Sequence, residues 1–367
     1  MFDPKHYVPI LQAKRGELTA LRELPAATLA SMTPLLEVPP VAWDWAEDGP
    51  AKSLDAHLTA TAAAIRRGWT GNAVLYVDQT TDAIELSERL ANNDHPYATL
   101  LGHLRQSGVH VIPVTGPDRD AAYDTAVRNA AAEDHQGACI RVGIDQFNFL
   151  TDAAAIAALL AAINLPRASV DLVIDLANVT TATAPALSIA VSAVLQQPTV
   201  IPAGWRTIIV ASGGFPQSMA GMAVGVHALR RCDLELWLQT CQRLPAGVQR
   251  PRFSDYAIQA PGLAEVDPRT MQMSANIRYA TPTDWLVVRG RFITGRNRVG
   301  FGEYQVLCQT LIARPEFRGP AFSPGDQYIA QCAAGQSSPG NPEIWRRQGT
   351  SHHLATVADQ FATLIVP

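Results

Sequence analysis

Short apolar runs alternate with amphipathic, Ala- and Leu-rich stretches along most of this 367-residue chain. The runs carry β-branched residues on both faces, which is typical of parallel strands covered on both sides. Strict alternation with helices indicates βαβ units, and eight units predict a TIM-like (β/α)₈ barrel over residues 1–268. The eight runs are YVPILQA, TPLLEVP, NAVLYVDQ, VHVIPVTG, ACIRVGID, VDLVIDLA, RTIIVASGG and FSDYAIQAPG.

A doubly wound open sheet is the alternative architecture, and the number of repeats favours the barrel. The stretch from the seventh run to about residue 244 is expected to be helical. Beyond residue 268 the pattern changes. ANIRYATPTDWLVVRGR predicts two strands around a Pro-containing turn, and EYQVLCQTLIARPEF and GDQYIAQCAAG predict helices. We therefore expect residues 269–367 to form a C-terminal α+β appendix packed on the barrel.

Composition narrows the class of partner. The net charge is −4, so no global basic field exists to hold nucleic acid without sequence preference. The N-terminus MFDPKHYV lacks a basic start followed by an apolar run, and no uninterrupted apolar stretch has the length of a membrane span, so we expect no signal peptide and no membrane. The five cysteines are scattered without a CxxC pair, which predicts reduced thiols in a cytoplasmic protein.

Ionisable and polar residues recur where the predicted strands end, the place at which (β/α)₈ barrels carry their chemistry. If the barrel is correct, they converge on one mouth. Burying several charges together is costly unless they pair or hold a ligand. Two interpretations stay open: a structural network of ion pairs, or a ligand-binding or catalytic site. The residues are Lys14, Glu37, Asp78, Arg141, Asp175 and Ser212.

The residue types at these positions suit an anionic ligand. Lys14 and Arg141, with Arg15 and Glu17 in the loop after the first strand, would bind a phosphate or a carboxylate. The three strand-end carboxylates could instead supply a base or hold Mg²⁺ through oxygen ligands. Backbone N–H groups at Ser212–Gly213 could face an anion, although two glycines after a strand are also an ordinary turn.

The predicted appendix has its own polar set. Arg278, Arg289 and Arg291 lie on or near its short sheet. Adjacent His352 and His353 would point to opposite sides of an extended segment, so one of them would face the site as a general acid or base. Hydrogen bonding at the edge of a core is the structural alternative. Zinc is disfavoured because no HExxH or His-x-His motif is present.

The chain resembles the beta family proteins at YVPILQAKRGELTAL, TPLLEVP, RYATPTDWLVVRGR, FSPGDQYI and WRRQGTSHHLATV. The resemblance spans nearly the whole chain. It implies that Lys14, Glu17, Glu37, Arg289 and the pair His352–His353 matter to the family. It implies no activity, because the family is known as poorly characterised proteins of bacteria and their phages. Their genes often lie near mobile or defence-related genes, which suggests a setting of phage–host conflict.

Three functions follow as hypotheses. The first is an enzyme, such as a hydrolase or phosphodiesterase, acting on an anionic small molecule at the barrel mouth. The second is a non-catalytic sensor or binding module of an anti-phage defence system, recognising a nucleotide or a phage protein partner. The third is nucleic-acid binding through the arginines between residues 278 and 298.

For the first hypothesis the sequence assigns a role to each candidate residue. The P-loop, dinucleotide-binding and GxSxG motifs are absent from the sequence, so these residues carry the hypothesis without a known signature. The catalytic candidates are Lys14, Glu37, Asp78, Asp175, His352 and His353. The ligand-binding candidates are Arg15, Glu17, Arg141, Ser212, Gly213, Arg278, Arg289 and Arg291.

Overall fold

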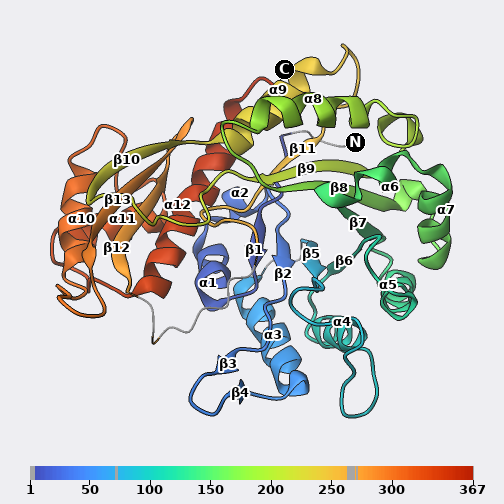
Figure 1. The fold of residues 1–367 in the computed structure, drawn as a ribbon, viewed down its shortest axis with the longest axis horizontal. Coiled ribbons are helices and arrows are strands. Elements are labelled where there is room, and N and C mark those ends of the chain that lie inside the picture. Colours follow the sequence, from blue (N-terminus) through green and yellow to red (C-terminus); the bar gives the residue numbers. More distant parts are fainter. Residues whose placement is uncertain (1–4, 71–72, 263–268, 270–271, 367) are drawn as a thin grey trace.

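In the computed structural model, which describes residues 5–70, 73–262, 269 and 272–366, eight parallel strands curl into a nearly closed barrel (Figure 1). The backbone N–H of Val8 donates to the carbonyl oxygen of Phe253 at 3.1 Å and joins the first strand to the last. The predicted (β/α)₈ architecture is confirmed. The strands, in order around the barrel, are β1 (Ile10–Gln12), β2 (Leu35–Glu37), β5 (Leu75–Asp78), β6 (Val111–Thr115), β7 (Ala138–Gly143), β8 (Val170–Asn178), β9 (Thr207–Gly213) and β11 (Arg252–Asp255).

Helices cover the outside of the barrel, and a small antiparallel hairpin, β3 (Trp43–Asp44) with β4 (Gly49–Pro50), projects from one of its loops. The chain supplies these helices between successive strands, as βαβ units require. They are α1 (Arg15–Glu23), α2 (Ala26–Leu29), α3 (Leu54–Gly68), α4 (Pro96–Gln106), α5 (Ala121–Asp134), α6 (Phe147–Thr151), α7 (Ala153–Ala162), α8 (Ala184–Leu195) and α9 (Cys232–Arg243), with short 3₁₀ turns at Ile144–Gln146, Arg167–Ser169 and Ile201–Ala203.

Alternation of side chains along each strand creates two cores. One face packs under the helices. The side chains of the other face fill the barrel interior. There Tyr76 donates its hydroxyl proton to Asp171 at 2.8 Å, and the remaining interior side chains are mostly apolar. The interior core consists of Val8, Ile10, Leu35, Tyr76, Ile112, Val114, Cys139, Val173, Ile209, Ala211 and Tyr256.

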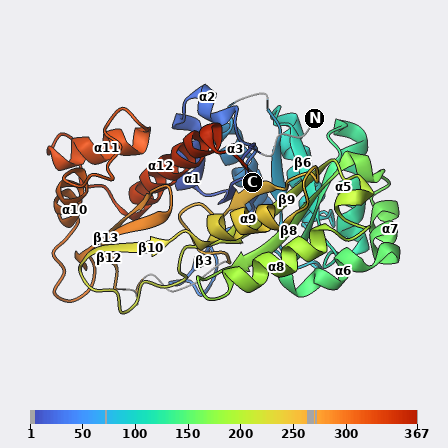
Figure 2. The same ribbon diagram turned by 90° about the horizontal axis from the view of Figure 1, so that it is seen from above.

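The appendix is a three-stranded antiparallel sheet with two helices against it, and Figure 2 shows it at one end of the molecule. The predicted strands and helices after residue 268 are present. The third strand was not predicted: β10 comes from a stretch expected to be helical, and it pairs with β13. The elements are β10 (Gly225–Arg230), β12 (Ser274–Ala280), β13 (Asp284–Phe292), α10 (Glu303–Ile312) and α11 (Pro324–Ala333).

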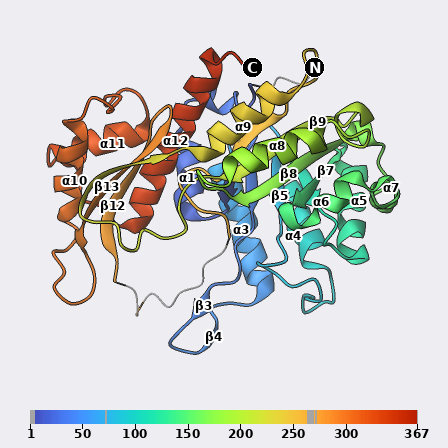
Figure 3. The same cartoon turned by 45° about the horizontal axis from the view of Figure 1, so that its top comes forward.

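The last helix, α12 (Pro342–Thr363), lies between the barrel and the appendix (Figure 3). Leu354, Val357 and Phe361 belong to the core under the barrel helices, whereas Trp345 belongs to the appendix core. The side chains from 348 to 357 are all buried, because both neighbours cover the helix. A helix covered on all sides needs no single apolar stripe, which explains its mixed sequence.

Among the described residues, no single helix is both long and apolar enough to span a membrane. One pair of consecutive helices, Ile144–Thr151 with Ala153–Ala162, passes by length and composition, but it is bent by 96°.

Because α12 completes the covering of the barrel, we expect Leu354→Ala to lower the free energy of unfolding by about 2–5 kcal/mol, as large-to-small changes in cores do. Leu354 is 0% exposed. Val306→Ala on α10, where the side chain is 50% exposed, is the control and should change stability by less than about 0.5 kcal/mol. Urea titration of both variants measures the difference. Equal stabilities would show that α12 is not part of the barrel core.

Candidate functional site

A polar layer closes the interior of the barrel at the carboxyl ends of its strands. Each of its residues follows an interior core residue by two positions, so it faces inward in the same way. Four of the six strand-end residues that were expected to converge lie in this layer, namely Glu37, Asp78, Arg141 and Asp175. Lys14 lines a separate cavity, and Ser212 faces outward. The pairs of core and polar residues are Ile10 with Gln12, Leu35 with Glu37, Tyr76 with Asp78, Cys139 with Arg141, and Val173 with Asp175.

The guanidinium of Arg141 is the centre of this layer. It donates to Asp78 at 2.7 Å, to Glu37 at 2.9 Å, and to Asp175 at 2.7 and 3.0 Å. Tyr256 donates its hydroxyl proton to Asp175 at 2.5 Å and accepts from Arg141 at 2.7 Å. The Arg141 side chain is 11% exposed, and Asp78 is fully buried. The ion-pair network that the sequence left open is therefore present.

Two further donors complete the layer. Arg119 donates to Asp78 at 3.1 Å, and the amide of Gln12 donates to Glu37 at 2.9 Å. Three carboxylates thus face two guanidinium groups, which leaves the layer with one excess negative charge when all are ionised. Burial raises the pKa of the Glu37 carboxyl above its ordinary value, and Asp78 adds to the rise while Arg141 opposes it. Glu37 is the member of the layer best suited to carry a proton.

A cation is already present in the middle of the three carboxylates, since the Arg141 guanidinium occupies that place. In the part of the chain that the structure describes, no three His, Cys, Asp or Glu side chains are placed to share a metal ion. The residues at the mouth therefore do not form the oxygen cage expected for Mg²⁺.

Glu37 lies on a small cavity of about 20 Å³, the space of about one water molecule. Gln259 forms one wall of this cavity and donates its amide to Glu17, which belongs to a second, larger cavity. Gln259 therefore links the small cavity to a residue that lines the larger one. The small cavity is lined by Ile10, Gln12, Glu37, Tyr256, Gln259, Ala260 and Gly262.

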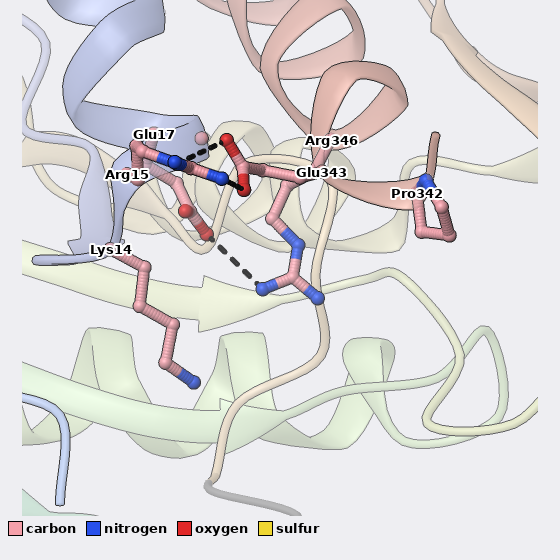
Figure 4. Close-up of a pocket in the computed structure, with 7 residues that line it drawn as sticks. Lys14, Arg15, Glu17, Pro342, Glu343 and Arg346 are labelled. Carbon is pink, nitrogen blue, oxygen red and sulfur yellow. Dashed lines mark hydrogen bonds and ion pairs between the residues drawn. The ribbon is translucent and has the colours of Figure 1, made fainter. Parts of the chain in front are cut away.

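The larger cavity, of about 270 Å³, lies where the amino ends of α1 and α12 meet. Figure 4 shows Lys14 and Arg346 reaching toward the same space from the two helices. The guanidinium of Arg15 pairs with Glu343 across the junction, with Nε and Oε1 2.6 Å apart. Helix amino termini favour negative charge because their first N–H groups point outward. The cavity is lined by Lys14, Arg15, Gly16, Glu17, Pro342, Glu343 and Arg346.

Glu17 is the buried group of this cavity. Its side chain is fully buried, and its Oε2 atom has no hydrogen-bond partner among the described residues. The guanidinium of Arg346 lies 3.8 Å from the other carboxyl oxygen. Burial raises the pKa of Glu17 above its ordinary value, and the charge of Arg346 opposes that rise. An unpartnered buried oxygen facing a cavity indicates a place where a ligand or water completes the hydrogen bonding.

Ser212 and Gly213 end β9, but their environments differ from a loop open to an anion. Ser212 is buried on the outward face and pairs in register with Asp255. A Cβ atom at Gly213 would lie 2.5 Å from Pro261. The glycine is therefore required by close packing of the following loop.

The three appendix arginines have separate local partners. Arg278 donates to the carbonyl of Ile258 at 2.6 Å, and burial together with Arg346 lowers its pKa to about 10. Arg289 donates to the carbonyl of Met219, and Arg291 pairs with Glu303 at 2.7 Å. They are distributed along the appendix sheet instead of gathering at the barrel mouth.

The two histidines lie in helix α12, so the prediction of an extended segment is wrong. Both are fully buried. His352 faces the appendix, with Nδ1 2.8 Å from Asp326 and its ring stacked on Tyr279 at 3.6 Å. His353 faces the barrel, with Nε2 2.8 Å from Asp255. The pair lies on the outside of the barrel wall and binds its two neighbours to α12, in agreement with the structural alternative.

A buried ionic cluster that was not predicted from the sequence surrounds His353. Asp255 accepts from Tyr7 and His353 and lies 3.8 Å from Arg231. Asp233 is fully buried beside it, and neither of its carboxyl oxygens has a hydrogen-bond partner among the described residues. Burial raises the pKa of Asp233 to about 6, opposed by Arg231 and assisted by Asp255. No motif marks these residues, because they come together from distant parts of the chain.

Comparison with known proteins places the chain in a family. A family model described as Beta protein matches residues 7–359, nearly the whole chain. No curated protein matches the chain.

We expect Arg141→Met to lower the free energy of unfolding by about 3–5 kcal/mol at neutral pH, because it leaves buried carboxylates unpaired. The loss should shrink as the pH falls, since protonation of Glu37 removes part of the repulsion among the carboxylates. The control is Arg128→Met on α5, whose guanidinium reaches the carbonyl of Ala162 at 3.5 Å. Chemical unfolding across pH measures both. Equal losses in the two variants would contradict a central role for Arg141.

Asp233 gives the folded chain a pH dependence of known sign. Its pKa in the folded state, about 6, exceeds the ordinary value of 3.8, so its contribution to stability is greatest below 3.8 and is lost as the pH rises through about 6. Asp233→Asn should remove this loss and stabilise the chain above that pH by up to about 3 kcal/mol. Asp82→Asn at an exposed position is the control. A variant less stable than wild type at high pH would refute the assignment.

Proposed function

The chain belongs to the Beta protein family, and we propose that it binds a small anionic molecule at the rim of its barrel, with Glu37 as the acid–base group beside it. The observation that carries this proposal is that two unlike cavities are linked by Gln259, which lines the small cavity and donates its amide to Glu17 of the larger one. The larger cavity is lined by cationic side chains at the amino ends of two helices. The other holds a carboxyl group whose pKa is raised by burial.

The larger cavity, which we call the rim cavity, would bind the ligand. Lys14 and Arg346 would contact the phosphate or carboxylate of the ligand, and the amino ends of α1 and α12 would add their favourable potential. Arg15 is engaged with Glu343 and would serve to hold the two helices together. A volume of about 270 Å³ suits a small molecule.

Glu37 supplies the reactive part. Glu37 is 7% exposed, borders the small cavity, and accepts hydrogen bonds from Gln12 and Arg141. A carboxyl group with a raised pKa can take up and release a proton closer to neutral pH. Movement of the Gln259 side chain would connect the two cavities. A ligand anchored at Lys14 could then place a scissile bond, or a water molecule, next to Glu37. This arrangement favours a hydrolase acting on an anionic substrate.

The alternative is a non-catalytic sensor of a defence system that recognises a nucleotide at the same rim. It is favoured by the full pairing of Arg141, since a guanidinium engaged with three carboxylates stabilises a structure whether or not chemistry follows. Turnover separates the two functions. Loss of substrate and appearance of product in the presence of the wild-type chain would favour the enzyme.

We expect Lys14→Ala and Arg346→Ala each to weaken binding of inorganic phosphate or adenosine monophosphate at least about tenfold, since each charge-assisted contact contributes about 1.5–3 kcal/mol. Lys52→Ala at an exposed position away from the cavity is the control. Glu37→Gln should keep ligand binding and lose turnover. Calorimetric titration measures affinity. Wild-type affinity in both cationic variants would exclude the rim cavity as the site.

Glu17 predicts a pH dependence of anion binding. Its ionised carboxylate would repel an anion in the cavity, whereas the protonated form would donate a hydrogen bond, so affinity should rise as the pH falls toward its raised pKa. Sulfate is the suitable probe because its own charge stays constant from about pH 8 to about pH 5. Glu17→Gln should bind sulfate more tightly at high pH and with little pH dependence. An unchanged pH profile in this variant would contradict the role of Glu17.

A further inference from the structure

The loop that joins β13 to α10 concentrates arginine and phenylalanine. Residues 291–302 read RFITGRNRVGFG, with three arginines, two phenylalanines and no acidic residue. The rest of the chain is acidic on balance, because the net charge is −4. The loop is therefore a local basic segment on a chain that would otherwise repel polyanions.

The apolar side chains of this loop are exposed together. Phe292 is 42% exposed, Val299 41% and Phe301 38%, and Val306 on the adjoining helix is 50% exposed. The backbone N–H of Val299 donates to the carbonyl of Phe292 at 2.9 Å, which brings the two arms of the loop side by side. Several exposed large apolar side chains within one short segment are unusual on a folded chain and indicate a surface that binds a partner.

The charges of the loop lie beside these rings. Arg291 pairs with Glu303 and stays 61% exposed at its side chain, and Arg296 and Arg298 are exposed. The loop leads into α10, and Figure 2 shows this helix at the end of the molecule opposite to α7. Arg289, nearer the middle of the strand, is engaged with the carbonyl of Met219. The exposed arginines and rings lie within one short segment and the helix that follows it, and we define this surface as residues 291–301 with Val306.

We propose that this surface binds single-stranded nucleic acid, with Phe292 and Phe301 as platforms for the bases and Arg296 and Arg298 as contacts to the phosphates. Phe292 and Phe301 are about two-fifths exposed, which leaves part of each ring accessible for a base to stack on. Membrane anchors instead project whole apolar side chains into the lipid. The combination of arginine, aromatic rings and absent acidic residues complements a strand that carries both negative charge and planar groups.

This inference goes beyond the rim site and does not rest on it. The test uses the full chain and a fluorescein-labelled, single-stranded oligonucleotide of about 15 nucleotides, DNA and RNA in turn. Fluorescence anisotropy should show binding that weakens as salt rises. Phe292→Ala/Phe301→Ala should weaken binding at least about fivefold, since each stacked base contributes about 1–3 kcal/mol. Arg296→Glu/Arg298→Glu should weaken it and flatten the salt dependence.

The controls are Ile189→Ala, an apolar residue of α8 that is 57% exposed, and Arg67→Glu at the exposed end of α3. Both should leave binding unchanged. Circular dichroism confirms that the loop variants are folded. The proposal is overturned if neither oligonucleotide binds at low salt, if folded loop variants bind as wild type does, or if the loop directs binding to anionic phosphatidylglycerol vesicles while oligonucleotides do not bind.

Discussion

The guanidinium of Arg141 holds the polar end of the barrel interior together. Strands that run parallel and curl into a barrel bring their inward-facing ends to one place, so Glu37, Asp78 and Asp175 must meet there. Without a cation they would repel one another in a space with little water. One rigid planar donor set reaches all three, which a lysine ammonium could not do with the same geometry.

That arrangement also decides where a ligand can bind. The centre of the mouth is filled by Arg141 and Tyr256, so open volume remains at the rim, next to β1 and α1. Glu37 is the carboxylate of the polar layer that borders the small cavity on this side, together with Gln12 and Tyr256. A cavity displaced from the barrel axis is the physical consequence of using the axis for ion pairing.

Much of this architecture could be predicted from the sequence. The eight apolar runs predicted the eight strands, because buried parallel strands have a simple pattern of β-branched residues bounded by turn formers. The convergence of Glu37, Asp78, Arg141 and Asp175 followed from their places at strand ends. Strand β10 was missed because GVHALR is short, part-exposed and paired with a distant strand. Pairing partners far along the chain leave no local signal.

The rim cavity was also only partly predictable, because its residues come from distant parts of the chain. Lys14 and Glu17 could be singled out because they follow a strand directly. Arg346 could not be assigned to the cavity, since its position depends on the docking of α12. The start of that helix is nevertheless readable, because Asn341 caps it and Pro342 occupies its first turn.

The histidine pair explains how α12 is held in the position that the cavity needs. Adjacent residues of a helix point about 100° apart, so His352 and His353 reach different neighbours. One is bound to Asp326 of the appendix and the other to Asp255 at the end of the last barrel strand. Together they fix the rotation of the helix about its axis, and the rotation decides whether Arg346 faces Glu17. The rim cavity is thus complete when the last helix has joined barrel and appendix, and two buried histidines that do not line the cavity determine where Arg346 lies.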